Sequence, residues 1–174
     1  SHCRVSSRCA QTGAAAVPAP VCAPLDDTLQ WLAARCELQL AAAGLHLQVD
    51  APADGCVAIS GQVLRQVCEN LIGNALDAMA GQASPQVDIT ADVRDRTIRL
   101  AVRDHGTGLS DDTLSRMVEP FCTTKEAGQG LGLGLAISAG IVGDFGGALS
   151  GSNHPDGGAV FTLELPLAEN EPSS

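Results

Sequence analysis

The stretch Glu119–Ser138 reads EPFCTTKEAGQGLGLGLAIS, and it decides how the rest of the chain is interpreted. Gly128, Gly130, Gly132 and Gly134 crowd in directly before an apolar run that is typical of a helix. Glycine loses more backbone entropy on folding than any other residue, so this clustering at a helix start needs a cause. Either the loop must bend and move, or a negatively charged ligand approaches the free N–H groups of the helix N-terminus.

Two familiar phosphate-binding loops do not explain these glycines. The run GLGLGLA resembles the GxGxxG spacing of dinucleotide folds only superficially, because it does not directly follow a parallel strand. No acidic residue ends a second strand about 20 residues further on, and no GK[ST] follows as in a Walker loop. On its own, the run leaves both a flexible hinge and a phosphate site open.

Apolar periodicity predicts the elements around this stretch. Helices are expected over 25–43, over 63–79 with Ser60 as N-cap, over 111–118, and from Leu131 to about Gly146. Strands are expected over 45–50, 56–60, 86–93, 96–104, 147–151 and 159–167, with a hairpin turn around Arg94 and Asp95. The pattern predicts an α+β fold: a two-layer α/β sandwich whose mixed, mostly antiparallel sheet is covered on one face by about three helices. One domain over 24–168 is expected, with a flexible lead-in or severed linker over 1–23 and a disordered tail over 169–174.

Composition excludes several function classes. The net charge of −10 over 174 residues argues against nucleic acid as a partner, although backbone amides and a metal ion could still hold a single nucleotide. No apolar run reaches the roughly 18 residues of a membrane span, and the start has no signal-peptide pattern. The seven cysteines show no CxxC pairs. We therefore expect neither a zinc site nor a disulfide framework, but a reducing, cytoplasmic setting.

A helix with two stacked carboxamides forms the first candidate site. In QVCENLIGNALDAM, Gln66–Met79, Asn70 and Asn74 lie four residues apart and so share one helix face, about 40° from each other. Their neutral oxygen atoms suit Mg²⁺, which keeps several waters and takes further ligands from phosphates. The alternative is the polar outer face of an ordinary amphipathic helix.

A carboxylate at a strand end forms the second candidate. In VRDHGTGLS, Val102–Ser110, the strand ends at Asp104 and a Gly-x-Gly turn follows. A carboxylate there could accept a hydrogen bond from the exocyclic amine of adenine. Gly106 and Gly108 would let the backbone approach a flat ring closely. A plain turn is the alternative.

Taken in order, these motifs resemble the N, G1, F and G2 boxes of the GHKL ATPases. NLIGNALDAM, DHGTGLS, EPFCTTKEAGQGLGLGLAIS, GIVGDFGG and GGAVFTLELP are similar to the catalytic domain of bacterial sensor histidine kinases. These motif residues are most similar to those of the nitrogen-regulatory and C4-dicarboxylate sensor branch. The resemblance covers roughly Leu25 to Leu167. The resemblance implies a Bergerat fold with a mobile ATP lid and two cofactors, ATP and Mg²⁺. It also implies transfer of the γ-phosphoryl group to a histidine.

The resemblance also implies residue roles. Asn74 would coordinate Mg²⁺ with support from Asn70, and Asp104 would hold the adenine amine. Asn70 and Lys125 are the catalytic candidates, although Lys125 could instead be a solvated loop lysine. The other residues implied in ATP binding are Asp77, Gly106, Gly108, Phe121, Thr123, Thr124, Gly130, Leu131, Gly132, Leu133, Gly134 and Thr162, with Gly158 beside Thr162 at the back of the pocket.

Some positions depart from the family pattern. Asp77 stands where some branches carry a phosphate-binding lysine, Cys122 replaces a usual phenylalanine, and Gly143 replaces a usual arginine. The N-box helix starts with Ser60 and Gly61, where an aspartate is common. These departures remove no implied nucleotide ligand.

The phosphoacceptor is not recognisable in this chain. His2, His46, His105 and His154 all lack the helical, acidic and proline context of the family's H box, so we expect them to be incidental. The acceptor histidine would lie on a separate dimerisation domain, with a response regulator downstream. The resemblance implies the cytoplasmic domain of an inner-membrane-anchored sensor, with no nucleic-acid or membrane contact of its own.

Two other classes of function remain open at this point. One is a non-catalytic nucleotide-binding module that regulates a partner. The other is a GHKL protein with a different acceptor, either an anti-sigma serine kinase or a gyrase-type ATPase. The EPF.TTK motif argues against each of these two GHKL proteins.

Overall fold

Five strands form one sheet in the order β2-β4-β5-β7-β6. The structure is a computed structural model that describes residues 23–39, 44–50, 56–118 and 133–168. The strands are β2 (Gly44–Asp50), β4 (Gln86–Arg94), β5 (Thr97–Asp104), β6 (Ala148–Asn153) and β7 (Ala159–Pro166). Strand β2 pairs with β4 in parallel and the other three pairings are antiparallel. The sheet is therefore mixed and mostly antiparallel, as predicted.

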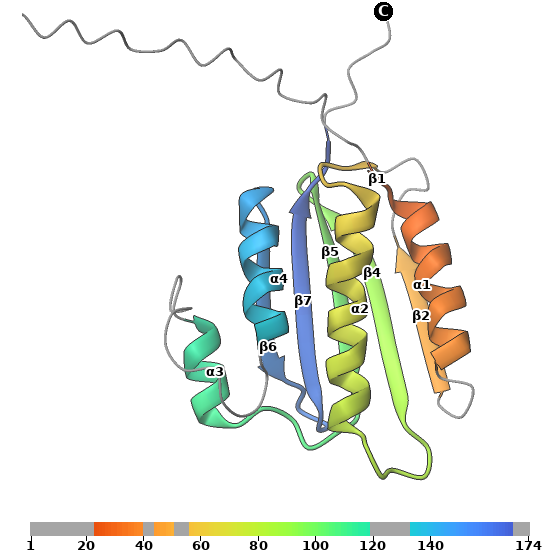
Figure 1. The fold of residues 1–174 in the computed structure, drawn as a ribbon, viewed down its shortest axis with the longest axis vertical. Helices are drawn as coiled ribbons and strands as arrows, with labels where there is room; N and C mark the ends of the chain where they lie inside the picture. The colour runs from red at the N-terminus through yellow and green to blue at the C-terminus, as the bar shows by residue number, and fades with distance from the viewer. Residues whose placement is uncertain (1–22, 40–43, 51–55, 119–132, 169–174) are drawn as a thin grey trace, which may run out of the picture.

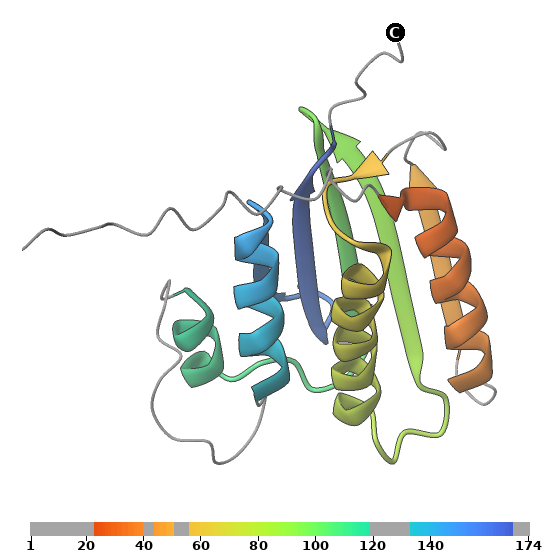
Figure 2. The ribbon, with the colours of Figure 1, turned by 45° about the horizontal axis from the view of Figure 1, so that its top comes forward.

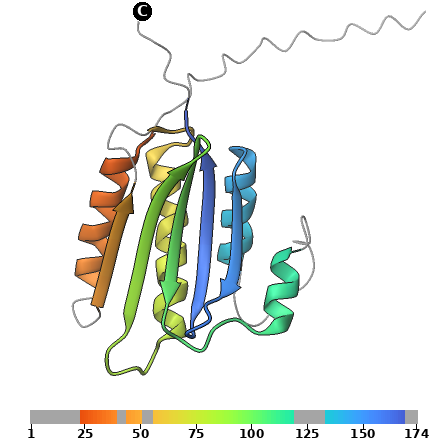
Figure 3. The same cartoon turned by 180° about the vertical axis from the view of Figure 1, so that it is seen from behind.

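Helices cover one face of this sheet. The helices α1 (Leu25–Gln39), α2 (Gly61–Ala78) and α4 (Leu133–Asp144) lie side by side over it, and α3 (Asp111–Val118) lies apart, beyond α4 and near β6 (Figures 1 and 2). The other face carries no helix in the part of the chain that the structure describes (Figure 3). The short strands β1 (Ala23–Pro24) and β3 (Cys56–Val57) pair with each other at one end of the helix layer. These two layers confirm the predicted sandwich.

The central helix α2 begins and packs as its sequence predicts. The Ser60 side chain accepts a hydrogen bond from the Val63 N–H at 3.3 Å, which satisfies one of the free donors at the helix start. One face of α2 is buried against the sheet, and each large apolar side chain buried there contributes about 1.5–3 kcal/mol. The buried residues of α2 are Leu64, Val67, Cys68, Leu71, Ile72 and Ala75.

The hairpin β4–β5 sets the position of Asp104. Asp95 and Arg96 form its turn with φ angles of 49° and 60°, the left-handed pair that matches strand twist. Along β5, alternate residues Ile98, Leu100 and Val102 are buried, and Asp104 continues the same series. Because side chains alternate along a strand, Asp104 faces the helix layer. The carboxylate of Asp104 therefore lies in the core, at the end of a row of buried apolar side chains on β5.

Three details differ from the expectations or extend them. Helix α1 ends at Gln39, and residues 40–43 of the expected helix lie outside the described part. Only Cys56 and Val57 of the expected strand 56–60 form a strand. Cys56 is disulfide-bonded, a departure from the expectation of a reducing setting without a disulfide framework. Cys68 does lie in the core.

The described helices are too short or too polar to cross a bilayer.

The N-cap of α2 can be tested directly. Replacing Ser60 with alanine removes the acceptor for the Val63 N–H, and we expect a loss of about 1 kcal/mol in the free energy of unfolding. Urea titration followed by circular dichroism measures it. The matched control is Ser84→Ala in the exposed turn after α2, which should leave the midpoint unchanged. Equal midpoints for both variants would contradict the capping role.

Candidate nucleotide-binding site

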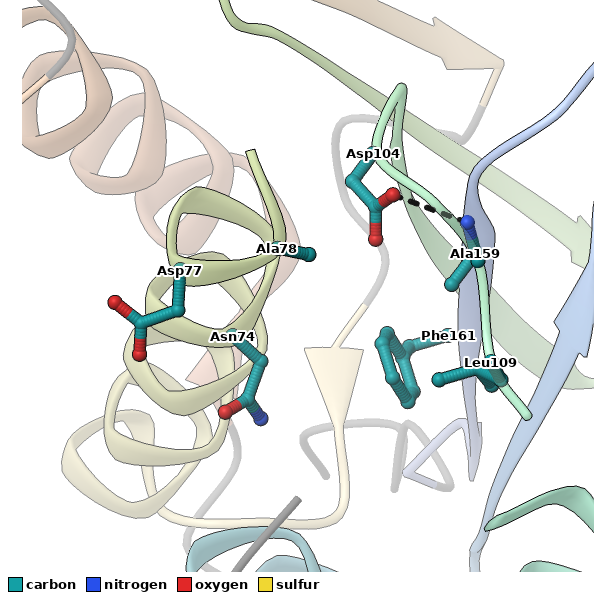
Figure 4. A pocket seen from close by; sticks show the side chains of 8 residues that line it. Asn74, Asp77, Ala78, Asp104, Leu109, Ala159 and Phe161 are labelled. Carbon is teal, nitrogen blue, oxygen red and sulfur yellow. Dashed lines mark hydrogen bonds between the residues drawn. The ribbon is translucent and has the colours of Figure 1, made fainter. Parts of the chain in front are cut away.

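A cavity of about 300 Å³ opens between α2 and the ends of β5 and β7. Its walls come from three segments that are far apart in the sequence: the last turns of α2, the loop that follows β5, and the start of β7 (Figure 4). The lining residues are Asn74, Asp77, Ala78, Asp104, Gly108, Leu109, Ala159 and Phe161. The structure thus brings together the two motifs that the sequence analysis singled out before the glycine run.

Asp104 is held in a fixed orientation at one end of this cavity. Its side chain is 1% exposed, and its Oδ1 atom accepts hydrogen bonds from the Gly106 N–H at 2.8 Å and the Ala159 N–H at 3.1 Å. In Figure 4 the other carboxylate oxygen points into the cavity. A buried carboxylate is costly unless hydrogen bonds satisfy it. The remaining oxygen is therefore placed to accept a hydrogen bond from a ligand.

Two glycines allow the backbone to close around Asp104. At Gly158, with φ of 83°, a Cβ atom would overlap the carbonyl oxygen of Asp104. At Gly106 a Cβ atom would lie 2.7 Å from the carbonyl oxygen of Ala78 in α2. Real Cβ atoms do not approach this closely, so both positions need glycine. Gly106 therefore lets the loop lie directly against the last turn of α2.

Asn74 lies across the cavity from Asp104 (Figure 4). Its Nδ2 atom is buried and has no hydrogen-bond partner in the part of the chain that the structure describes. Leaving such a group unsatisfied costs roughly 1–3 kcal/mol. Native proteins rarely do so without a functional reason or a bound partner. Asp77, one turn further along, is exposed, and its carboxylate points away from Asp104.

Asn70 joins two helices. Its Nδ2 atom donates a hydrogen bond of 2.9 Å to Ser138 Oγ, and Ser138 is 3% exposed on α4. A Cβ atom on Gly134 would lie 2.5 Å from Oδ1 and 2.6 Å from Nδ2 of the same amide. The first turn of α4 therefore packs directly against Asn70. The sequence spacing predicted that Asn70 and Asn74 share one helix face, but it did not indicate the contact between Asn70 and α4.

The residue after Asp104 is also anchored. His105 was expected to be incidental, but its Nε2 atom lies 2.8 Å from Asp88 Oδ2 on β4, and its carbonyl oxygen accepts a hydrogen bond of 3.1 Å from Gln82. Burial raises the pKa of Asp88, but hydrogen bonds from Gln86 and His105 and the charges of His105 and Arg103 outweigh it and hold the pKa below its usual range. The Asp88–His105 contact fixes the start of the loop that follows β5.

The remaining predicted residues fall into three groups. Thr162 does not line the cavity: side chains alternate along β7, so Thr162 faces the opposite side from the lining residue Phe161. Leu133 begins α4, and its backbone alone is described. The residues Phe121, Thr123, Thr124, Lys125, Gly130, Leu131 and Gly132 lie outside the described part of the chain.

Sequence reasoning missed several lining residues. Ala78, Leu109, Ala159 and Phe161 are apolar residues on periodic or loop segments, and nothing in their spacing separates them from ordinary core positions. Only Ala159 carried a signal, because it directly follows the paired glycines 157 and 158.

Comparison with known proteins identifies the family. The model of the family described as "Histidine kinase-, DNA gyrase B-, and HSP90-like ATPase" matches residues 60–169, which is well over half of the chain and includes every residue that lines the cavity. The chain therefore belongs to this ATPase family.

Its relatives narrow the class to sensor kinases. The C4-dicarboxylate transport sensor protein DctB of Pseudomonas aeruginosa is 46% identical over 103 residues, which is 59% of this chain and 17% of that protein. The sensor histidine kinase component HK1 of Mycobacterium tuberculosis is 35% identical over 130 residues, 74% of this chain and 75% of that protein. The catalytic domain of histidine kinase ThkA matches with a TM-score of 0.68 at 27% identity, over 83% of this chain and 93% of that structure. The fold is thus the Bergerat fold of histidine kinase catalytic domains.

The chain spans 17% and 19% of the length of the two DctB proteins, from Pseudomonas aeruginosa and Rhizobium meliloti. The family match therefore applies to the ATPase-type domain alone. It does not extend to the activity of a whole sensor protein.

The contact between α4 and Asn70 can be tested with two glycines of the same helix. An added Cβ at Gly140 meets nothing within 4 Å, so Gly140→Ala should raise the free energy of unfolding by up to about 1 kcal/mol through helix propensity. Gly134→Ala, in the first turn of α4, gains no more than this from propensity and pushes a methyl group into the Asn70 amide, so we expect net destabilisation. Denaturant titration compares the two. Equal stabilisation by both would show that α4 does not pack on Asn70 in this way.

Proposed function

We propose that this domain binds Mg-ATP in the cavity and donates the γ-phosphoryl group to a histidine on a separate phosphoacceptor domain. The observation that carries the proposal is the carboxylate of Asp104, which is buried at the end of a central strand. Two backbone N–H groups hold one of its oxygens, and the other points into the cavity. An acceptor that has no partner among the described residues, in a mostly apolar cavity, suits an exocyclic amine such as that of adenine.

The size and surroundings of the cavity support a division between base and phosphates. A volume of about 300 Å³ lies at the low end for ligand sites and suits a nucleoside rather than a whole nucleotide. The N-terminal end of α4 lies at the same end of the sheet as the end of β5 (Figure 1). Free N–H groups and the helix dipole favour negative charge there. The phosphates would therefore extend from Asp104 past Asn74 toward α4.

The residues present fit a magnesium ion that depends on the nucleotide. Among the described residues, no group of three or more His, Cys, Asp or Glu could hold a metal ion. Asn74 offers a carboxamide whose nitrogen has no hydrogen-bond partner in the part of the chain that the structure describes. The oxygen and nitrogen of an amide are assigned from hydrogen bonding, so the oxygen can equally occupy that position. With Asn74 as ligand and Asn70 in support, Mg²⁺ would take its other ligands from phosphates and water. Bound there, it would supply neutralisation of the triphosphate charge.

The protein's own contribution to phosphoryl transfer is then positioning and electrostatics. Asp104 fixes the base, and the N–H groups of the first turn of α4, Leu133 and Gly134 among them, would hold phosphate oxygens. We propose that Lys125 contacts the γ-phosphate and that Phe121, Thr123 and Thr124 belong to a lid whose hinge includes Gly130 and Gly132. Asp77 would lie at the rim.

The wider setting follows from the relatives. The ThkA structures include a complex with the response regulator TrrA, and the DctB relatives are transport sensors. We therefore propose that the acceptor is the dimerisation domain of the same cytoplasmic signalling protein, and that a response regulator receives the phosphoryl group from it.

The metal assignment is tested by Asn74→Ala. We expect the affinity for ATP in the presence of Mg²⁺ to fall about tenfold or more, because a metal contact is lost, while the affinity measured in EDTA changes little. Titration calorimetry measures both. Gln66→Ala is the matched control, because Gln66 lies on the same helix, is exposed and does not line the cavity. Unchanged Mg-ATP affinity in Asn74→Ala would remove the metal site.

The transfer step needs its own experiment. The domain is mixed with radiolabelled ATP and the phosphoacceptor domain of a DctB protein, and labelling of the acceptor histidine is followed by acid lability. We expect labelling that depends on Mg²⁺. Tight ATP binding without transfer would favour a non-catalytic nucleotide-binding module, and a domain that binds no ATP would overturn the proposed function.

A further inference from the structure

Asn153, the last residue of β6, fastens the loop that follows Asp104. Its Oδ1 atom accepts a hydrogen bond of 2.7 Å from the Leu109 N–H, and its Nδ2 atom donates one of 2.9 Å to the Leu109 carbonyl oxygen. One side-chain amide thus satisfies both backbone groups of a single residue, as a neighbouring strand would. The two opposed bonds fix both the distance and the rotation of that peptide segment.

This clamp acts on a wall of the cavity. Leu109 lines the cavity and packs against the hydrophobic core, so the position of its backbone sets the shape of that wall. Gly108, the preceding lining residue, has φ of 79°, and a Cβ atom there would lie 2.8 Å from Asn153 Oδ1. The close approach of Asn153 is therefore a second reason, besides the left-handed backbone, why position 108 needs glycine.

The rest of the loop is held from other directions. Its start is fixed by Asp104 through Gly106, and by Asp88 and Gln82 through His105. Its end passes directly into α3, whose first turn is capped by Ser110. Asn153 is the tether between these two ends. Without it, residues 107–109 would be free to move away from the helix layer and open the cavity.

Asn153 itself lies outside the cavity. It is exposed and is not among the lining residues, so it touches a ligand only through the loop that it holds. We propose that Asn153 is a positioning residue for the nucleoside base: it acts through Leu109 and Gly108 to keep the base end of the cavity preformed. This inference rests on the proposed function, because it concerns the same site and its ligand.

A preformed base pocket has a specific consequence. Asn153 contributes to the part of the affinity that depends on the base, because an ordered loop avoids the entropy cost of ordering it on binding. It contributes little to the affinity for phosphate groups, which bind at α4 on the other side of Asn74. The two contributions can be separated with a ligand that lacks the base.

The test is Asn153→Ala in the whole chain. We expect the Kd for Mg-ATP to rise about tenfold, from the loss of two hydrogen bonds that organise the loop. Inhibition of ATP binding by inorganic tripolyphosphate should be unchanged, and KM for ATP in phosphotransfer should rise with little change in kcat. Ser152→Ala, at the exposed preceding position of the same strand, is the matched control and should bind ATP as the original protein does.

A double-mutant cycle with Gly108→Ala gives a second measurement. The new methyl group would meet Asn153 Oδ1, so Gly108→Ala should weaken ATP binding less in the Asn153→Ala background than in the original protein. Purely additive effects would contradict direct contact between the two positions.

The outcomes separate this inference from the proposed function. If the original protein binds no ATP, the proposed function fails. If it binds ATP and Asn153→Ala binds equally well, only the positioning role of Asn153 is overturned. An equal loss for ATP and tripolyphosphate would also overturn it, because Asn153 would then support the fold in general rather than the base pocket.

Discussion

The carboxylate of Asp104 accepts hydrogen bonds from two backbone N–H groups that belong to different segments of the chain. Gly106 lies in the loop after β5, and Ala159 begins β7. These bonds join the end of one central strand to the start of its neighbour and orient the carboxylate at the same time. Because Asp104 is buried, losing either bond would leave a poorly compensated charge in the core. The local backbone packs closely around this residue. A Cβ atom at Gly158 would overlap the Asp104 carbonyl oxygen, and one at Gly106 would lie 3.0 Å from Asp104 Oδ1.

A second constraint acts in the helix layer. Asn70 and Ser138 connect α2 to α4, and Gly134 allows the first turn of α4 to approach the Asn70 amide. The helix that follows the glycine run is thus held against the helix that carries Asn74. This arrangement brings the N-terminus of α4 to the same end of the sheet as the C-terminal end of α2, the helix that carries Asn74 (Figure 1). The free N–H groups at this helix start would favour the negative charge of the proposed phosphates.

The sequence was sufficient for the fold wherever periodicity is strong. The apolar stripe of α2 and the alternation along β5 predicted their elements closely. The hairpin turn expected around Arg94 and Asp95 lies one residue further on, at Asp95 and Arg96. Asp104 was singled out as a candidate because it ends a predicted strand and a Gly-x-Gly turn follows it directly. Family resemblance then supplied the order of the motifs, and the matched ATPase family confirms it.

Other features could not be predicted for physical reasons. Phe161 lines the cavity, but a buried aromatic residue on a strand looks the same whether it faces a ligand or the core. The contacts of Ser138 and Asn153 join residues 68 and 44 positions apart, and no local pattern encodes such pairs. Thr162 was assigned to the pocket by motif position, although strand alternation turns it to the other face. The spacing of the cysteines in the sequence did not indicate that Cys56 forms a disulfide.

The central claim is that the free oxygen of Asp104 accepts a hydrogen bond from the amino group of adenine. The most direct measurement compares the affinity of the intact chain for ATP and for purine riboside 5′-triphosphate, which lacks only that amino group, by titration calorimetry at the same Mg²⁺ concentration. A buried hydrogen bond to a charged acceptor predicts binding weaker by about tenfold or more for the analogue. Equal affinities for the two ligands would contradict the account.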